Sequence, residues 1–218
     1  MVFKVSKLEQ FTETVNTSTR RDKTEWKLLL RNRNLQLFSI IKIFECLYFA
    51  SLAYLPFLAN QIGLRVSKYT FLLGISLLIT FVFAVIAGYI ADKKEKKFFY
   101  VFDIAYDAIP AIIFGVTRDV TLFYVAFLLM SVKDILSPVS FAYKYECFSD
   151  EDVKIVIPIL SSVSSLVYVI APLIVSVLWI RYNTSVFIIG GICSIIAAVI
   201  ALIYLPRTAG VDLNQELK

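Results

Sequence analysis

Six ionisable side chains lie within stretches of sequence that are otherwise apolar, and they form three close pairs. The pairs are Lys42 with Glu45, Asp103 with Asp107, and Lys133 with Asp134. A charged group in the hydrocarbon core of a membrane costs at least about 2.5 kcal/mol, so each of the six needs a physical reason to be there. Carboxyl groups buried near one another can share a proton, and a carboxylate beside an ammonium group forms an ion pair. The six residues are therefore candidates for proton transfer or for a network of ion pairs.

Helical spacing brings these residues toward one another. Residues three or four positions apart lie on one face of a helix, so the first two pairs each share a face. At a rise of about 1.5 Å per residue, the pairs lie roughly 8 to 15 Å from the cytoplasmic ends that we expect for their helices. We therefore expect one cluster, in a single layer slightly to the cytoplasmic side of the membrane midplane, between the first, third and fourth helices.

The cluster has two possible roles. In the first, Glu45, Asp103 or Asp107 takes up and releases protons to drive the export of a solute. With four carboxyls and only two lysines, the cluster is not neutral if every acid is ionised, so Asp103 and Asp107 are the natural pair to share a proton. In the second role, the cluster is a static network that holds the third helix against the first and fourth.

The elements that would position these residues are six apolar stretches in a chain of 218 residues. The chain is 59% hydrophobic and 18% charged, a balance that a soluble domain rarely has. Each stretch approaches or exceeds the roughly 20 residues that a helix needs to cross a bilayer. They cover residues 35–59, 69–91, 98–116, 121–143, 155–180 and 184–205. Because they are continuous rather than alternating, they predict an all-α integral membrane protein with a six-helix bundle, not a barrel.

The basic residues predict how the bundle lies in the membrane. With the N-terminus inside, the cytoplasmic segments hold 16 Lys and Arg residues and the outer loops hold four. We expect a basic cytoplasmic tail over residues 1–33, the bundle over residues 34–206, and a cytoplasmic tail over residues 207–218. The basic residues that we expect on the cytoplasmic side of the lipid bilayer account for the net charge of +5, and no nucleic-acid partner is needed to explain it.

A short polar segment, GYIADKKEKK at residues 88–97, follows the second apolar stretch. The lysines are typical of a cytoplasmic membrane anchor. An aspartate just past a helix C-terminus opposes the helix dipole, so Asp92 is expected to have a cation or the N-terminus of another helix as its partner. Gly88, one turn earlier, has no side chain and lets a neighbouring helix come close.

This segment resembles the signature of the major facilitator superfamily of transporters, G-x-x-x-D-[RK] followed by basic residues, between the second and third helices. The matching positions, which form a conformational-switch motif in that family, are Gly88, Asp92, Lys93, Lys96 and Lys97. The segments LRNRNLQLF, SPVSFAYKYECFSDEDV, IAPLIVSVLW and LPRT are similar to parts of the drug and siderophore exporter branch. The resemblance covers residues 30–208. In that family the first and fourth helices line the central cavity and the third packs outside them, which favours a structural role for Asp103 and Asp107. Glu45 and Lys133 are as well placed to face the central cavity as to belong to the static network of charges.

The resemblance implies one half of a transporter, because such proteins usually contain two six-helix bundles. We expect an N-terminal bundle that works with a second one, supplied by another copy of the chain or by a companion chain. The sequence departs from the family where Glu95 replaces a glycine and where the start of the fourth helix has no arginine.

The implied function is proton-coupled export of a small apolar or amphipathic solute from the cell, by alternating access. The alternatives are a non-transporting truncated paralogue or membrane interaction subunit and, less well supported, a channel. The chain has no histidine, no phosphate-binding glycine loop and no paired cysteine motif. We therefore expect neither an enzyme nor a bound metal or cofactor.

Overall fold

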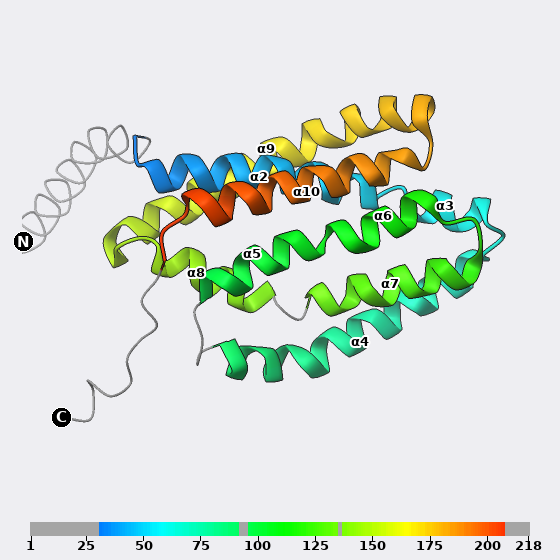
Figure 1. The fold of residues 1–218 in the computed structure, drawn as a ribbon, viewed down its shortest axis with the longest axis horizontal. Coiled ribbons are helices and arrows are strands. Elements are labelled where there is room, and N and C mark those ends of the chain that lie inside the picture. Colours follow the sequence, from blue (N-terminus) through cyan, green and yellow to red (C-terminus); the bar gives the residue numbers. More distant parts are fainter. Residues whose placement is uncertain (1–30, 92–95, 135–136, 208–218) are drawn as a thin grey trace, which may run out of the picture.

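Six antiparallel helical passes make up the part of the chain that the structure describes (Figure 1). The computed structural model describes residues 31–91, 96–134 and 137–207; within these ranges, the side chains of residues 84–91, 133–134, 137–138 and 150–151 lie outside the description. The passes are α2 (Arg33–Leu52) with α3 (Leu55–Gln61), α4 (Val66–Ala91), α5 (Lys96–Tyr106) with α6 (Ala108–Val116), α7 (Val120–Asp134) with α8 (Ser137–Glu146), α9 (Asp150–Tyr182) and α10 (Ser185–Tyr204). The expectation of an all-helical bundle is confirmed.

Polar side chains mark where several of the helices begin. The Asn32 side chain accepts a hydrogen bond from the Asn34 backbone N–H at 2.9 Å, and Asp119 accepts one from Leu122 at 2.9 Å. The hydroxyl of Ser149 accepts one from the Asp152 backbone N–H at 3.3 Å. Such caps satisfy N–H groups that have no partner within the helix.

Three of the predicted spans are interrupted. The first contains a break at Ala53 and Tyr54, after which Pro56 occupies the first turn of α3, where its missing N–H costs little. The third breaks at Asp107, because Pro110 cannot donate a hydrogen bond to the carbonyl of Tyr106.

The fourth pass corrects the prediction of one continuous span over residues 121–143. It is made of α7 and α8, of 15 and 10 residues. At about 1.5 Å per residue neither is long enough to cross a bilayer alone. Within the described residues, five helical segments are long and apolar enough to cross a membrane, and the apolar part of α7 is a shorter one.

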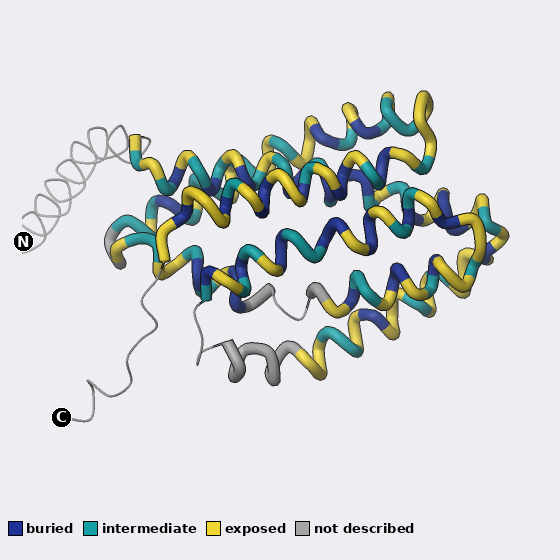
Figure 2. Tube along the Cα trace, in the orientation of Figure 1, coloured by how far each residue is buried: buried dark blue, intermediate teal, exposed yellow. Residues whose placement is uncertain are grey.

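Helix α10 lies at the centre of the packing, against α2, α5 and α6 (Figure 1). By contrast, α9 and the described side chains of α4, up to Phe83, include few buried residues (Figure 2). In the most apolar stretch of each, 6% of α4 and 11% of α9 is buried, compared with 44% of α10. Helix α4 is joined to α7 by a hydrogen bond of 2.6 Å between the buried hydroxyls of Ser76 and Ser131.

Glycines permit the closest approach of α10 to its neighbours. A Cβ atom added at Gly190 would lie 2.8 Å from the Ser51 hydroxyl and 3.3 Å from the Tyr48 Cα atom on α2. One added at Gly191 would lie 3.1 Å from the Ala111 Cβ atom on α6. Small residues of this kind are what allow helices to associate within lipid.

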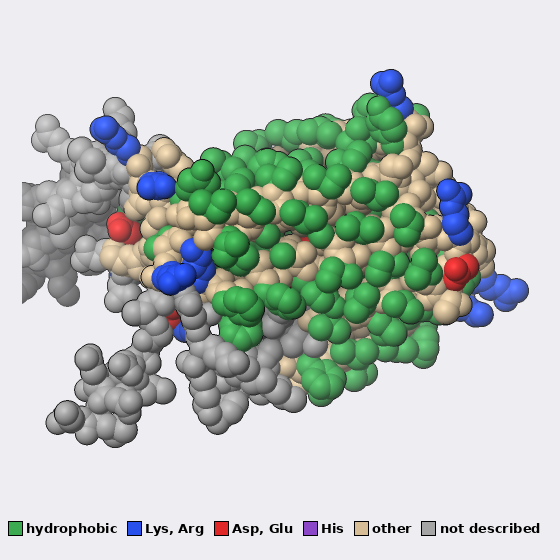
Figure 3. Space-filling view, viewed as in Figure 1, with side chains coloured by type: hydrophobic (Ala, Val, Ile, Leu, Met, Phe, Trp, Pro, Cys, Tyr) green, Lys and Arg blue, Asp and Glu red, His purple; other side chains and the backbone are tan. Residues whose placement is uncertain are grey.

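The two ends of the bundle differ in chemistry. We call the end where α2 begins and α10 finishes the lysine end, after Lys96, Lys97 and Lys144. We call the other the aromatic end, after Tyr54 and Trp179. Between them, apolar side chains cover the face seen in Figure 3, with lysines and arginines at both ends. This band of apolar surface between charged ends is the pattern expected of a protein that spans a bilayer.

Candidate functional site

Lys42 and Glu45, the pair predicted on the first helix, form an ion pair on α2. The Lys42 Nζ atom donates to Glu45 Oε2 at 2.9 Å. The Glu45 residue is only 7% exposed, whereas Lys42 is half-buried and also lies 5.8 Å from the centroid of the Phe49 ring. A buried carboxylate held by an adjacent ammonium group can exist in apolar surroundings, because the pair compensates its own charge.

Asp103 and Asp107, the pair predicted on the third helix, occupy different structural positions. Both are buried, but Asp107 lies at the break between α5 and α6. Asp103 accepts a hydrogen bond through Oδ2 from the hydroxyl of Ser140 on α8. Ser140, which connects the third pass to the fourth, is one polar residue that was not identified from the sequence.

Aromatic side chains connect the first and third passes near these charges. Tyr100, on α5, is 1% exposed, and its ring centroid lies 5.8 Å from that of Phe38 on α2. Glu45 and Asp103 are both buried. The side chains of Lys133 and Asp134 lie outside the described part of the structure, so the single six-member cluster remains a prediction.

Two lysines of the motif form contacts with other helices of the bundle. Lys97, which is 9% exposed, donates to the carbonyl oxygens of Leu202 at 2.9 Å and Leu205 at 2.6 Å. These carbonyls lie at the C-terminal end of α10, where the helix dipole favours a cation. The neighbouring Lys96 forms an ion pair with Glu146 at the end of α8. The surroundings of Gly88, and the residues Asp92 and Lys93, lie outside the described part of the structure.

A tyrosine provides a second connection at the same place. The hydroxyl of Tyr143, on α8, donates to the carbonyl oxygen of Pro206 at 2.6 Å. Together, Lys97 and Tyr143 hold the end of α10 against the third and fourth passes. The sequence contains no signal that identifies this arrangement, because the accepting groups are backbone carbonyls that every residue has.

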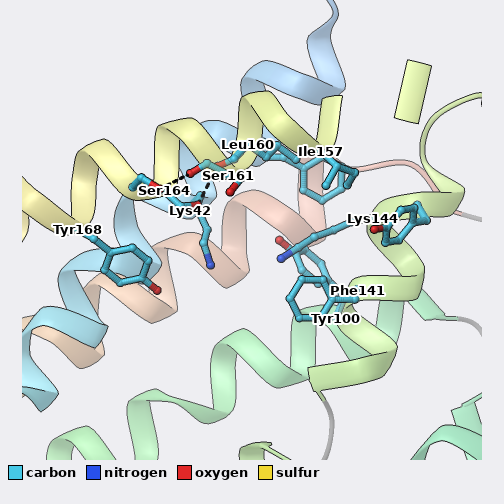
Figure 4. Close-up of a pocket in the computed structure, with 12 residues that line it drawn as sticks. Lys42, Tyr100, Phe141, Lys144, Ile157, Leu160, Ser161, Ser164 and Tyr168 are labelled. Atoms are coloured by element: carbon cyan, nitrogen blue, oxygen red, sulfur yellow. Dashed lines mark hydrogen bonds between the residues drawn. The ribbon is translucent and has the colours of Figure 1, made fainter. Parts of the chain in front are cut away.

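A pocket of about 360 Å³ opens between α2, α5, α8 and α9 at the lysine end (Figure 4). The ammonium groups of Lys42 and Lys144 both point into it, from α2 and α8 (Figure 4). Its other lining residues are aromatic, aliphatic or hydroxyl-bearing: Phe38, Tyr100, Phe141, Tyr145, Ile157, Leu160, Ser161, Ser164, Ser165 and Tyr168.

Sequence reasoning missed this pocket for a specific reason. Lys144 counted only as one of the basic residues on the cytoplasmic side, and the run SSVSS at residues 161–165 received no role. Four serines among five residues in the middle of an apolar span were the signal that could have indicated a polar surface on α9.

The composition of the site does not favour a metal. Among the described residues, no three Asp, Glu, Cys or His side chains come together as metal ligands. The pocket instead combines cations, hydroxyls and aromatic rings, which suit an organic solute.

Comparisons with known proteins identify the fold and no more. No family model matches the chain, and no curated protein matches it in sequence. A solved structure described as "Crystal structure of auto inhibited POT family peptide transporter" matches with a TM-score of 0.67 and 14% sequence identity. The match covers 82% of this chain and 39% of that one, so the chain spans well under half of that transporter's length. The chain therefore has an all-helical fold that matches part of the fold of that transporter.

Proposed function

We propose that this bundle is one half of a transporter in the cell membrane, which moves a small apolar or amphipathic solute by alternating access against a second six-helix bundle. The observation that carries the proposal is the match over 82% of this chain to 39% of a transporter. A pocket lined by residues of the first, third, fourth and fifth passes supports it, because solute sites in such proteins lie between helices near the bundle interface.

The second bundle comes, in this proposal, from another copy of the chain or from a companion chain. Helix α9 and the part of α4 up to Phe83 offer the surfaces for it, since few of their described residues are buried within the bundle. The resemblance of the motif around Asp92 adds a specific contact, with the aspartate engaging a helix N-terminus of the second bundle. Both chain termini are cytoplasmic in this arrangement, as the distribution of basic residues favours.

Coupling to protons is assigned to Glu45. Its carboxylate is buried and held at 2.9 Å by Lys42, and Lys42 also lines the pocket. When a solute in the pocket displaces the Lys42 ammonium group, the ion pair between Lys42 and Glu45 therefore changes as well. Export is the direction that the likeness to drug exporters implies.

A second candidate, a non-transporting membrane subunit, is favoured by the contacts of the motif lysines. Lys97 bonds to α10 and Lys96 to α8, so both stabilise this bundle itself. In that case the charges hold the helices together and the pocket has no transport role.

Transport into liposomes distinguishes the two candidates. Purified protein is reconstituted with a pH gradient, and uptake of ethidium, an amphipathic cation, and of 4-phenylbutyrate, an amphipathic anion, is followed. We expect gradient-driven uptake of at least one probe, and its loss in Glu45→Gln. Asp152→Asn, which removes a carboxyl at the same end that lies outside the pocket and the motif, is the matched control and should keep the activity.

The number of chains per active unit is measured on the same liposomes by single-molecule photobleaching. Paired copies predict two bleaching steps, reduced to one by Asp92→Lys but not by Asp152→Lys. Uptake that is unchanged in Glu45→Gln would remove this residue from coupling. A stable monomer without uptake of either probe would favour the non-transporting subunit.

A further inference from the structure

We propose that a groove between α2 and α10, at the lysine end, binds an anionic phospholipid, with the lipid phosphate on Arg33 and an acyl chain along the groove. The groove has a volume of about 400 Å³ and is lined by Arg33, Gln36, Leu37, Ile40, Ile200 and Tyr204. It has no lining residue in common with the solute pocket. The site therefore goes beyond the proposed transport function and does not depend on it.

The first argument is the depth of the groove in the membrane. Helix α2 begins at Arg33 and α10 ends at Tyr204, and the two helices pack side by side (Figure 1). The mouth of the groove is therefore at the edge of the apolar band, where lipid headgroups begin. Arginine and tyrosine both suit this level, because each has an apolar body and a polar tip. From Arg33 to Ile40 the groove follows α2 for roughly 10 Å, about two-thirds of the depth of one leaflet.

The second argument is the charge at the mouth of the groove. Arg33 is exposed in the first turn of α2, where the helix dipole disfavours a cation and where no acidic side chain compensates it. None of the described residues that line the groove is acidic, and no carboxylate of the described residues forms an ion pair with Arg33. A guanidinium group presents two parallel N–H donors, which fit the oxygens of a phosphate. An anionic headgroup therefore supplies the charge that this position requires.

The third argument is the orientation of Arg33. Its Cζ atom lies 6.0 Å from the centroid of the Tyr204 ring, which belongs to the other wall of the groove. A ring attracts a guanidinium group without neutralising it, so the charge remains effective toward a phosphate. The contact holds the arginine across the mouth of the groove, between the two helices. Arg31, two residues earlier, is also exposed but does not line the groove.

The fourth argument concerns the acyl chain. Beyond its mouth, the groove has apolar walls, formed by Leu37 and Ile40 on α2 and by Ile200 on α10. A hydrocarbon chain between two helices contacts apolar atoms on both sides, whereas a chain beside a single helix contacts them on one side only. The groove therefore favours a phospholipid over a soluble phosphate compound.

A groove at the aromatic end provides a comparison. It has a volume of about 500 Å³, lies between α4 and α7, and is lined by Lys68, Tyr124 and apolar side chains. Its cation is an ammonium group, which lacks the planar pair of donors that a guanidinium group presents to a phosphate. We therefore assign the phospholipid to the groove of Arg33, and the groove of Lys68 serves as a control.

Native mass spectrometry of the intact chain, released from detergent micelles, measures lipid binding without requiring transport. The probes are phosphatidylglycerol and phosphatidylcholine with the same acyl chains, so that only the headgroup differs. We expect phosphatidylglycerol to bind about tenfold more tightly. Equal affinity for the two lipids would overturn the assignment, because the headgroup charge would then have no effect. Displacement of phosphatidylglycerol by an equal concentration of soluble glycerol 3-phosphate would also overturn it, since the acyl chain would then contribute nothing.

Variants at the mouth of the groove locate the headgroup. In Arg33→Gln the preference for phosphatidylglycerol should disappear, whereas Arg33→Lys keeps the charge without the paired donors and should retain about a threefold preference. Arg31→Gln is the matched control and should keep the full preference, because Arg31 is exposed at the same end but does not line the groove. A loss in Arg31→Gln or Lys68→Gln equal to that in Arg33→Gln would mean a diffuse attraction to anionic lipid and would contradict the site.

A variant that fills the groove tests the acyl chain separately. In Ile40→Trp the indole ring occupies space between α2 and α10 while Arg33 is retained, and binding of phosphatidylglycerol should weaken about fivefold. Ile203→Trp is the control, because Ile203 is 64% exposed on α10 and does not line the groove. Unchanged binding in Ile40→Trp would overturn the groove as the site of the acyl chain, even if Arg33→Gln loses its preference.

Discussion

Buried aromatic rings pack at both ends of the bundle, as Tyr100 and Tyr143 do at the lysine end with centroids 5.0 Å apart, but the polar contacts of the two ends differ. At the lysine end, Lys97 and Tyr143 donate to backbone carbonyls of α10, Lys96 pairs with Glu146, and Ser140 donates to Asp103. At the aromatic end, the rings of Tyr54 and Trp179 stack with centroids 4.9 Å apart, and Trp179 meets Phe187 edge-on at 6.0 Å. Gly190 lets α10 approach α2 nearby.

The difference indicates which end can change its contacts. Close packing of rings and glycines depends on shape, and a tightly packed interface tolerates little displacement. Hydrogen bonds and ion pairs can be exchanged for others of similar strength, including bonds to water or to a ligand. The pocket, Lys96 and Lys97 are all at the lysine end, so this is the end where we expect conformational change.

The largest loss of stability is expected from filling the space beside Gly190, between α10 and α2 at the aromatic end. In Gly190→Leu the new side chain meets the Tyr48 backbone and the Ser51 side chain on α2, and the helices must separate. We expect a loss of about 3 kcal/mol in the free energy of unfolding, measured by titration with SDS. Gly74→Leu is the control, because a Cβ added at Gly74 has no atom within 4 Å. If both variants are equally stable, shape complementarity does not hold this end.

A smaller loss is expected at the lysine end from Lys97→Met. The variant leaves two carbonyls at the end of α10 without their ammonium donor, and we expect a loss of about 2 kcal/mol in the same titration. Lys96→Met removes a partly exposed ion pair and should cost less than about 1 kcal/mol. A larger loss of unfolding free energy in Lys96→Met than in Lys97→Met would contradict the assignment of Lys97 as the cap of α10.

The smallest effect concerns reactivity rather than stability. Cys147 follows α8, outside the membrane-spanning segments, and burial raises the pKa of its thiol to about 11. Only the thiolate reacts with maleimide, so at pH 7.5 labelling should be about 100-fold slower than for a thiol with an ordinary pKa. In a Cys46→Ala/Cys193→Ala background, the labelling rate should keep rising with pH up to about 11. A plateau near pH 9 would show that this part of the lysine end is open to water.

Several features of the bundle were predictable from local sequence. The apolar stretches predicted all-helical passes because a helix that crosses lipid needs about 20 apolar residues. The spacing of Lys42 and Glu45 predicted one face, and the structure gives their contact at 2.9 Å. The division of the fourth pass into α7 and α8 was not recognised, although Pro138 lies near its interruption.

The partners of the polar residues depended on tertiary structure. Ser140 meets Asp103 across 37 positions of sequence, and Lys97 meets Leu205 across 108. Lys42 and Lys144 share a pocket although they lie on different helices of the bundle. No local pattern encodes such distances, because they depend on which helix faces pack together.

The sequence by itself determined that this protein is a helical membrane bundle, since composition and the length of apolar stretches decide which solvent each segment prefers. Only the tertiary structure decided which charges meet, that Lys97 and Lys96 bond to α10 and α8, and that two lysines face one pocket. The physical reason is that transfer into lipid is a property of each segment alone, whereas an ion pair, a cap or a pocket exists only when distant segments occupy the same place.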